Sequence, residues 1–574
     1  MQEKWVLRRR SYQELAERLH IPPVLAHVIR NRVSEEETEK YLDREGPLED
    51  PFLMMGMEEA CGILLQARQD HVEIRVVGDY DVDGVTATAI LCLGLSALGC
   101  IVSYRIPDRM EDGYGIRKHM VDEAITEGCG LILTCDNGIR EFETMTYAKE
   151  KGIPVVLTDH HEITQDAEGH DVLPEAACVI DPHRQDDTYP CKDLCGAGVA
   201  FKLVQALAKR TGGTVPASLI GYAALGSVCD VVKLVGENRR IVWQGLEEWN
   251  LHPPVGIAAL MDAAMLKNLT VYSFGFVIGP MINAGGRLKN QQSLIRILLT
   301  EDPAEAYVLA QELKRLNEER QNMTQVGIEE ASLLVETALK NDIVKVLHLE
   351  DLHESIAGLV AGRIKERYYR PAIVFSGTED LVKGSGRSIE GYDLFRHLQE
   401  QDALLERYGG HPLAAGLSIR KDRIGELRRA LNAHCEIPED KLQPTVVVDA
   451  MLPLAEADLQ LAGLLTRLEP FGTGNERPVF AAMNVEVLSL RLMGRKQNVC
   501  RLQLLQDGRP CEAITFRVEV LKEVISERYG MDVWERLSTG ARAERGICLD
   551  LLYHLEINEF RGMTSAQCTI CNIR

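Results

Sequence analysis

The sequence predicts an α/β protein with several domains, in which a parallel-sheet domain, a long connecting helix and a second α/β domain precede a small β-barrel. Three observations predict this organisation. The chain of 574 residues is too long for a single hydrophobic core. Short apolar runs alternate with helix-like stretches between residues 74 and 250, which is typical of βαβ units. After about residue 443 the pattern changes to short strands.

The first α/β domain is predicted to span residues 71–300, after an N-terminal helical segment at residues 1–70. Its expected strands include the apolar runs 131–133 and 155–157. Uninterrupted apolar runs are typical of strands in a parallel sheet that helices cover on both faces. We therefore expect a parallel sheet that is buried on both sides.

Residues 301–340 are predicted to form a connecting helix, as one long helix or as two in series. From Asp302 to Lys340 the chain contains hardly any helix breaker besides Gly327, and it is rich in Ala, Glu, Leu, Gln and Arg. Polar residues occupy much of the expected helix circumference, as is typical of a helix that joins two domains.

The remaining two domains are predicted from shorter patterns. Residues 341–442 are expected to form the second α/β domain, with a helix at 356–368 and strands at 344–347, 373–375 and 382–384. Residues 443–574 are expected to form the β-barrel, with a glycine-rich turn at 472–475 and strands at 445–448, 485–488, 501–505 and 549–555.

The net charge of −22 by itself argues against a polyanionic partner, because binding to phosphates depends on clustered Lys and Arg. Two basic clusters, at residues 363–370 and 491–501, nevertheless occur. Each is more simply interpreted as a solvated face than as a ligand surface.

The 15 cysteines indicate free thiols in a reducing cytoplasm. Cys191 and Cys195 form a lone pair of neighbours with no second pair to complete a zinc site. The N-terminus has no apolar core after its charges, and no window approaches about 18 uninterrupted apolar residues. We expect a cytoplasmic protein without a membrane segment.

Three carboxylates at every second residue, Asp79, Asp81 and Asp83, directly follow the apolar run 74–77. An EF-hand calcium loop requires Glu at its twelfth position, which is Ile90 here, and a helix before the loop, where a strand is expected. At an extended strand end, alternate residues point to the same side, so Asp81 and Asp83 are expected to share one cleft. Three clustered like charges favour a bound cation over a purely structural role.

The same arrangement recurs along the chain. Asp136 follows the apolar run LILT, Asp159-His160-His161 follows PVVLT, and Asp230 follows AALGSVC. Ligand sites of open α/β sheets lie outside the carboxyl ends of the strands, so these segments are predicted to converge on one site.

Carboxylates with one or two imidazoles suit Mn²⁺ or Mg²⁺, and two such ions can hold the attacking and leaving oxygens of a phosphoryl transfer. Either Asp136 or Asp81 could bridge the pair. The alternative for either histidine is a structural role.

These motifs resemble the DHH phosphoesterase superfamily, and the resemblance covers nearly the whole chain. It implies that His161 stabilises charge on the phosphate and that Asp81 and Asp136 take part in catalysis. Some superfamily members have a ligand histidine where this chain has Val77. The resemblance also implies two metal ions, with ligands or ligand neighbours at Asp79, Asp81, Asp83, Asp136, Asp159, His160 and Asp230.

Downstream motifs resemble the superfamily's DHH-associated domain, which grips phosphate near the cleaved bond. Glycine turns with free N–H groups can also cradle an anion. A stretch at 279–287 resembles a segment near the DNA path, although Met281 stands where the family often has Arg, and 469–475 resembles the segment that leads into an OB-fold. The implied substrate-binding residues are Arg287, Ser385, Arg387, Ser388, Gly409, Gly410 and His411.

By resemblance, the chain is expected to be a 5′→3′ exonuclease that hydrolyses single-stranded DNA to mononucleotides in DNA repair and recombination. The implied partners are single-stranded DNA, a single-strand-binding protein and a helicase, and a monomer is expected. Three alternatives stay open at this point: a phosphodiesterase for oligoribonucleotides or cyclic dinucleotides, a phosphatase or pyrophosphatase, and a non-catalytic nucleic-acid scaffold.

Overall fold

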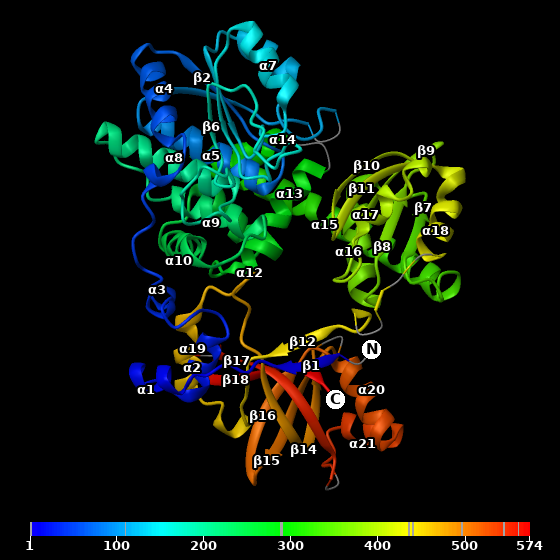
Figure 1. Cartoon of the computed structure of the whole chain (residues 1–574). Coiled ribbons are helices and arrows are strands. Elements are labelled where there is room, and N and C mark those ends of the chain that lie inside the picture. Colours follow the sequence, from blue (N-terminus) through cyan, green and yellow to red (C-terminus); the bar gives the residue numbers. More distant parts are fainter. Residues whose placement is uncertain are drawn as a thin grey trace. The chain divides into compact units, whose positions relative to one another are not determined.

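The computed structural model describes residues 3–108, 111–287, 291–433, 435, 437–438, 441–494, 497–543, 546–560 and 562–574, without the side chains of 287 and 291–293 (Figure 1). The chain forms two compact units. The larger unit contains residues 7–314 and 447–574, and the smaller unit contains residues 315–446 with the first residues of the chain. None of the described helices combines the length and apolar character that a membrane-spanning segment needs.

The larger unit contains a five-stranded sheet in the order β3-β2-β4-β5-β6, in which every pair of neighbours is parallel. All residues of β4, β5 and β6 are buried, because helices cover both faces. The parallel sheet predicted from the apolar runs is therefore confirmed. Its strands are β2 (Glu73–Val77), β3 (Ile101–Arg105), β4 (Leu131–Cys135), β5 (Val155–Thr158) and β6 (Cys178–Ile180).

Two separate hydrophobic cores lie on the two faces of this sheet. Helices α4 (Met57–Gln69), α5 (Val82–Ala97) and α8 (Gly196–Thr211) contribute to the larger core. Helices α6 (Lys118–Thr126) and α7 (Phe142–Lys151) contribute to the core on the other face.

A group of helices follows the sheet in the larger unit. The apolar run that precedes Asp230 was expected to end a strand, but it forms helix α9, which packs against α5, α8 and α10. A helix buried on several sides is apolar around most of its circumference, so its sequence lacks the helical period and resembles a buried strand. These helices are α9 (Leu219–Cys229), α10 (Gly236–Leu251), α11 (Val255–Ala263), α12 (Val271–Ser273), the π-helical η2 (Phe274–Ile278), α13 (Gly279–Arg287) and α14 (Gln291–Leu299).

The predicted connecting helix is one continuous helix, α15 (Pro303–Thr337). Gly327 does not interrupt it. A Cβ atom at Gly327 would lie 2.7 Å from Leu352, so the glycine marks a close packing contact of the helix.

The smaller unit contains a mixed five-stranded sheet in the order β10-β11-β9-β8-β7. Gly384 was expected to end a strand and the other glycines of this region to form turns, but Gly386, Gly409 and Gly410 also lie within strands, in β9 and β10. A Cβ atom at Gly384 would lie 2.5 Å from the Phe375 ring, so this glycine makes room for a neighbouring side chain. The elements are β7 (Lys345–Leu349), α16 (Ala357–Tyr368), β8 (Ala372–Ser376), β9 (Leu381–Arg387), α17 (Leu394–Gln399), β10 (Leu405–His411), β11 (Ala414–Arg420) and α18 (Ile424–Ala433).

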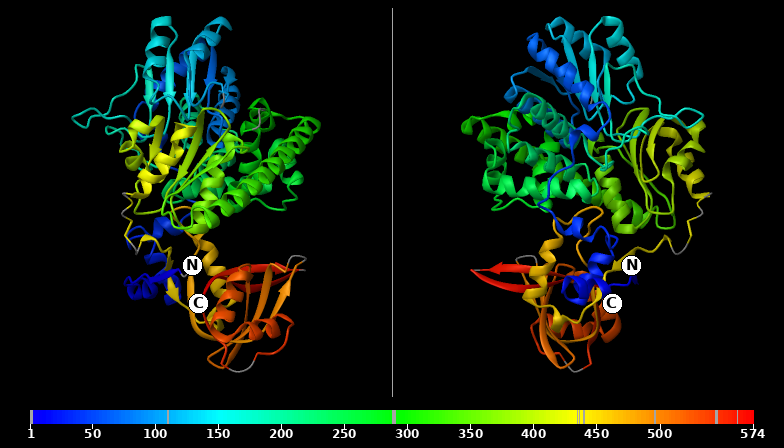
Figure 2. Two further views of the ribbon diagram at one scale, coloured as in Figure 1. Left: turned by 90° about the vertical axis from the view of Figure 1, so that its right-hand side faces the viewer. Right: turned by 60° about the vertical axis from the view of Figure 1, so that its left-hand side comes forward.

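The C-terminal part of the larger unit is a closed barrel of five strands, because β14 pairs with both β15 and β17. The predicted barrel is confirmed, and its β17–β18 hairpin is drawn in red in Figure 2. Three helices, α19 (Leu459–Leu465), α20 (Val518–Tyr529) and α21 (Met531–Ser538), accompany the strands. The short strand β13 (Ala450–Met451) pairs with β14 outside the closed ring. The five barrel strands are β14 (Phe480–Met493), β15 (Val499–Gln506), β16 (Arg509–Thr515), β17 (Cys548–Phe560) and β18 (Met563–Ile573).

The strand predicted at residues 445–448 is β12 (Thr445–Val448), and it lies outside the barrel. It pairs instead with β1 (Lys4–Leu7) in a two-stranded sheet. A short run of β-branched residues predicts a strand but carries no information about its partner.

Helices from the N-terminal segment pack in the same hydrophobic core as the barrel. They are α1 (Gln13–Leu19), α2 (Pro23–Arg30) and α3 (Thr38–Leu42). The buried side chain of Arg239 joins α10 to the N-terminal helices and to the segment before the barrel. Its guanidinium donates hydrogen bonds to the backbone oxygens of Tyr41, Arg467 (3.0 Å) and Glu469 (2.8 Å).

Candidate metal centre

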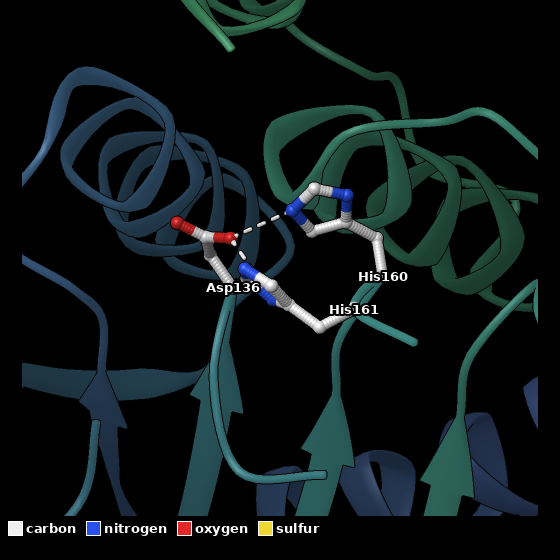
Figure 3. Close-up of side chains that lie close together, drawn as sticks. All are labelled: Asp136, His160 and His161. Carbon is white, nitrogen blue, oxygen red and sulfur yellow. Dashed lines mark hydrogen bonds and ion pairs between the residues drawn. The ribbon is translucent and has the colours of Figure 1, made fainter. Parts of the chain in front are cut away.

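The predicted acidic and histidine residues gather at the carboxyl edge of the parallel sheet. Figure 3 shows three of them, Asp136, His160 and His161. Asp79 follows β2, Asp136 follows β4 and Asp159 follows β5. Asp230 joins them from the C-terminal end of α9. The convergence expected from the strand ends is therefore present, although one of the four segments reaches it from a helix.

Three sets of side chains have potential ligand atoms that all lie within 4.8 Å of one another. They are Asp136 with His160 and His161, Asp83 with His160 and Asp230, and Asp79 with Asp81 and Asp136. Because Asp136 and His160 each belong to two sets, the sets form one contiguous cluster, which is large enough for more than one cation.

Asp81 and Asp83 lie at the start of helix α5, not at the extended strand end that the alternating pattern predicted. Asp81 is the N-cap residue, and its carboxylate accepts a hydrogen bond from the Gly84 N–H (3.0 Å). A capping aspartate satisfies a free amide at a helix start, so the same spacing of carboxylates is compatible with a helix.

The N-terminus of α8 holds Asp83 in place. The carboxylate of Asp83 accepts hydrogen bonds from the N–H groups of Gly196 (2.6 Å) and Ala197 (2.9 Å). A Cβ atom at Gly196 would lie 2.5 Å from the Cβ atom of Asp136. The close approach of α8 to the cluster therefore requires a glycine at this position, a constraint that the sequence analysis missed.

Asp136 occupies a constrained backbone position, with φ of 62° in the left-handed region. Its Oδ1 atom lies 3.0 Å from His160 Nε2 and 4.0 Å from His161 Nδ1. The next residue, Asn137, ties this turn to the sheet, because its amide donates to the backbone oxygens of Val77 (3.1 Å) and Cys135 (2.9 Å).

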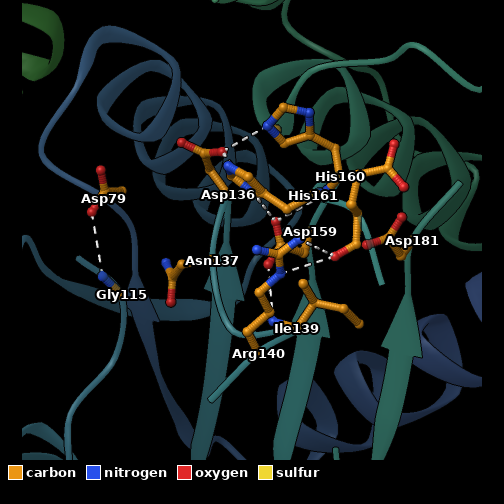
Figure 4. Close-up of polar contacts among 12 residues, drawn as sticks. Asp79, Gly115, Asp136, Asn137, Ile139, Arg140, Asp159, His160, His161 and Asp181 are labelled. Carbon is orange, nitrogen blue, oxygen red and sulfur yellow. Dashed lines mark hydrogen bonds and ion pairs between the residues drawn. The ribbon is translucent and has the colours of Figure 1, made fainter. Parts of the chain in front are cut away.

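Asp159 is turned toward protein donors (Figure 4). One oxygen accepts from the Ile139 N–H (2.9 Å), and the other accepts from the His160 N–H (2.8 Å) and lies 2.7 Å from His161 Nδ1. Asp159 belongs to none of the three ligand sets among the described residues. Of the two roles implied by the resemblance, ligand or neighbour of a ligand, this geometry favours the neighbour.

Tyr114 is a candidate site residue that the sequence analysis missed. Its hydroxyl donates to the backbone oxygen of Asp136 (2.7 Å) and lies 3.1 Å from His161 Nδ1. The available signal was its place between Gly113 and Gly115, which both have positive φ values and so form a turn of unusual geometry.

Burial and mutual repulsion raise the pKa of several carboxyl groups in the cluster. Burial, with the neighbouring Asp81 carboxylate, raises the pKa of Asp79 to about 8. Burial, with the Asp83 carboxylate, raises the pKa of Asp230 to about 7. The same two causes hold the pKa of Asp136 well above its ordinary value. Carboxylates that repel one another in a buried site are stabilised by divalent cations, and the oxygen and nitrogen donors fit Mn²⁺ or Mg²⁺.

The pKa values of the two histidines are also raised, although burial acts on them in the opposite direction. Burial lowers the pKa of His160, but the carboxylates of Asp83 and Asp230 outweigh this effect and raise the pKa above its ordinary value. For His161 burial likewise lowers the pKa, and its hydrogen bond to Asp159 more than offsets the loss. The imidazolium forms are thus favoured when no cation is bound.

The residues predicted to contact substrate in the smaller unit lie at one end of its sheet. Register places His411 opposite Ala414, which in turn lies opposite Arg387. The Arg387 guanidinium donates to the Ser385 hydroxyl (3.1 Å), whereas the buried Ser388 hydroxyl donates to the Tyr392 backbone oxygen (2.7 Å). The last contact favours a structural role for Ser388.

The contacts of the other predicted substrate-binding residues, and of the two basic clusters, give no direct support for a phosphate site. Gly409 and Gly410 lie in β10, where they pair with β11. The side chain of Arg287 lies outside the described residues. The two basic clusters are partly neutralised, because Arg363 pairs with Glu366 and Arg501 with Glu512.

Models of three protein families match successive parts of the chain. The N-terminal domain of the DHH family matches residues 73–227, the DHHA1 domain matches 341–436 and the RecJ OB domain matches 448–572. Together with the acidic edge of the parallel sheet, the first match makes this chain a DHH phosphoesterase.

Within that class, the chain belongs to the RecJ family of single-stranded-DNA-specific exonucleases. It is 34% identical to RecJ of Escherichia coli (strain K12), over 100% of both chains. It is 32% identical to RecJ of Bacillus subtilis (strain 168), over 91% of this chain and 67% of that protein.

Solved structures of RecJ share the fold. RecJ of Thermus thermophilus in complex with Mn²⁺ superposes with a TM-score of 0.78 at 28% identity, over 100% of this chain and 79% of that one. A second RecJ structure, bound to manganese, is 34% identical with a TM-score of 0.59, over 69% of this chain and 97% of that one.

Proposed function

We propose that this chain degrades single-stranded DNA in the 5′→3′ direction to mononucleotides, with two Mn²⁺ or Mg²⁺ ions, in DNA repair and recombination. The observation that carries the proposal is the contiguous cluster of carboxylates and imidazoles at the sheet edge, in a chain of the RecJ family. The family match and the manganese and magnesium complexes of Thermus thermophilus RecJ support the choice of substrate and metal.

We propose a separate role for each of the predicted domains. Residues 71–300 would form the catalytic domain and 341–442 the substrate-binding domain, joined by the helix at 301–340. Residues 443–574 would bind single strands, since OB barrels do so along a groove, and the segment 1–70 would support this barrel.

We assign the metal-holding role to the residues of the three ligand sets other than His161, with Asp159 as a positioning residue. Bound cations would neutralise phosphate charge and lower the pKa of a water molecule. The proposed ligands are Asp79, Asp81, Asp83, Asp136, His160 and Asp230.

His161 is proposed to stabilise the charge that develops on the phosphate. Asp159 orients its ring and favours the protonated form, so the imidazolium is available to donate a hydrogen bond to a phosphate oxygen. In the smaller unit, Arg387 and His411 supply donors for the backbone phosphates, with Ser385 positioning Arg387.

A digestion of single-stranded DNA labelled at either end tests activity and polarity together. With Mn²⁺ present, the 5′ label is expected in mononucleotides before the 3′ label. Early release of the 3′ label would refute the polarity. Faster cleavage of dinucleotides than of long strands would instead indicate a small-substrate phosphodiesterase.

The matched variants are Asp81→Asn, at the proposed centre, and Asp166→Asn, an exposed aspartate outside it. Asp81→Asn is expected to abolish digestion, and Asp166→Asn to leave it unchanged. Undiminished digestion by the Asp81→Asn protein would remove Asp81 from the site.

We further propose a cytoplasmic monomer that works with a single-strand-binding protein and a helicase, as the family resemblance suggests. Sedimentation of the full chain would test the monomer. Stimulation of digestion on partly double-stranded DNA by an added helicase would test that partnership.

A further inference from the structure

A groove of about 800 Å³ lies in the larger unit, and no residue of the metal cluster lines it. One wall comes from α10, α12 and η2, and the other from residues 469–477. The walls are held together by contacts within the unit, including the Leu234 N–H to the Thr473 backbone oxygen (2.7 Å). The volume lies within the range of about 300–1,000 Å³ that is usual for ligand sites.

The groove exposes large apolar side chains. Leu251 is 73% exposed, Tyr272 67% and Phe276 65%, and the two aromatic rings stack with centroids 5.0 Å apart. Pro470 and Phe471 line the opposite wall. Contiguous exposed aromatic and aliphatic groups of this kind are typical of surfaces that bind a protein segment.

The charged groups of the groove are mostly acidic. Glu247, Glu469 and Glu476 line it together with one cation, Arg477, which pairs with Glu556 outside the lining (2.6 Å). Arg44 also reaches this rim, since its guanidinium lies over the Trp243 ring and interacts with Glu469 and Glu247. With Glu556 included, four carboxylates face the two cations Arg44 and Arg477, so the rim keeps an excess of negative charge. Such a rim repels nucleic-acid phosphates and attracts lysine or arginine.

We propose that this groove binds a segment of a partner protein that carries aromatic or aliphatic side chains flanked by lysine or arginine. Its apolar residues insert between Tyr272, Phe276 and Phe471, and its cations face the carboxylates of the rim. The proposal does not depend on nuclease activity, because none of these residues belongs to the metal cluster.

The test is a selection from yeast-displayed random peptides of 12 residues, with the full-length protein as bait in EDTA. Clones that also bind the Tyr272→Ser/Phe276→Ser variant are removed. The remaining peptides are expected to be apolar and rich in lysine or arginine. Acidic peptides, or no clones that depend on these two aromatics, would overturn the proposal.

Matched variants distinguish peptide binding in the groove from nonspecific binding to other exposed side chains. Tyr307→Ser alters an aromatic residue on α15 that is 62% exposed outside the groove, and it is expected to leave peptide affinity unchanged. Glu247→Gln/Glu476→Gln should weaken the selected peptide about tenfold, as expected for rim charges, whereas Asp262→Asn should not. Equal affinities for these charge variants would contradict the acidic-rim argument.

Single-stranded DNA is the rival occupant. The Tyr272→Ser/Phe276→Ser variant is expected to bind and digest single-stranded DNA within about twofold of the original protein, since base stacking would contribute about 5- to 150-fold per ring. A tenfold loss of DNA affinity in this variant would assign the groove to the DNA and overturn the proposal.

Discussion

Asp136 belongs to two of the three ligand sets, so this one carboxylate connects Asp79 and Asp81 to the two histidines. Its neighbours are other carboxylates and two imidazoles in a buried environment, in which every charge affects the protonation of the others.

Asp136→Asn is expected to reduce digestion of single-stranded DNA by at least about 10³-fold, because it removes a shared ligand and an electrostatic stabiliser. The same change relieves repulsion in the metal-free protein. We therefore expect the melting temperature in EDTA to stay constant or rise while activity is lost. A fall in melting temperature together with retained activity would contradict both assignments.

The stability of the metal-free protein is predicted to fall as the pH rises from about 5.5 to 8.5. Burial raises the pKa of Asp79 to about 8 and of Asp230 to about 7, above the value of about 3.9 for an unfolded aspartate. The folded protein thus holds protons that the unfolded chain has released, so stability declines between those values. The raised pKa of His160 acts in the same direction.

Melting in EDTA across this pH range measures the effect, and added Mn²⁺ should raise the melting temperature more at pH 8.5 than at pH 5.5. The Asp79→Asn/Asp230→Asn variant should show a flatter pH profile in EDTA. A pH-independent melting temperature of the original protein would contradict the raised pKa values.

Tyr114→Phe tests whether the hydroxyl of Tyr114 positions His161 and the Asp136 turn. Loss of hydrogen bonds of this kind costs about 1–2 kcal/mol, so kcat should fall by roughly 5–30-fold with little change in KM. Steady-state kinetics with Mn²⁺ provide the measurement. A rise in KM by a similar factor, with kcat unchanged, would indicate instead that the Tyr114 hydroxyl contacts the substrate.

At the scale of elements, the N-termini of α5 and α8 bring backbone amides to the carboxylates of Asp81 and Asp83. Amides at a helix start carry partial positive charge, which offsets part of the repulsion within the cluster. The strand ends thus position the carboxylates, and the N-termini of these two helices provide partial positive charge beside them.

Gly196→Ala is predicted to disturb this arrangement, because its Cβ atom would lie 2.5 Å from that of Asp136. We expect a loss of about 1–3 kcal/mol of stability and at least tenfold weaker Mn²⁺ binding, measured by calorimetry. Gly62→Ala on α4 is the matched control, since no atom lies within 4 Å of its added methyl group. That variant should be neutral or slightly stabilising.

At the scale of the whole molecule, Arg239 on α10 joins the N-terminal helices and the segment before the barrel to the helices that follow the parallel sheet. It does so through three backbone oxygens, and desolvation by burial lowers the pKa of its guanidinium to about 10. Removing a buried donor leaves acceptors unsatisfied, which costs more than the loss of an exposed ion pair.

Arg239→Leu is therefore expected to destabilise the protein by about 3 kcal/mol and to split thermal unfolding into two transitions, as seen by differential scanning calorimetry. Lys209→Ala removes an exposed pair with Asp50 and serves as the control, with an expected change within about 0.5 kcal/mol. A single unchanged transition in the Arg239→Leu variant would show that the hydrogen bonds of Arg239 are not needed for cooperative unfolding.

The sequence by itself determined the fold class, the parallel sheet, the long helix and the barrel, and it singled out carboxylates and histidines that gather at one edge of that sheet. These features follow from local patterns: apolar runs mark buried strands, and residues that follow parallel strands reach one edge. Asp136 and Asp159 were predictable for that reason.

Only the tertiary structure decided the features that depend on contacts between distant segments. Asp230 approaches from a buried helix whose uniformly apolar sequence resembles a strand, and Tyr114 is recruited from a turn between strands. Gly384 makes room for the Phe375 ring on the neighbouring strand, a contact that no local pattern indicated. A local pattern records whether a residue is buried, but the partner that buries it is set by packing across the whole chain.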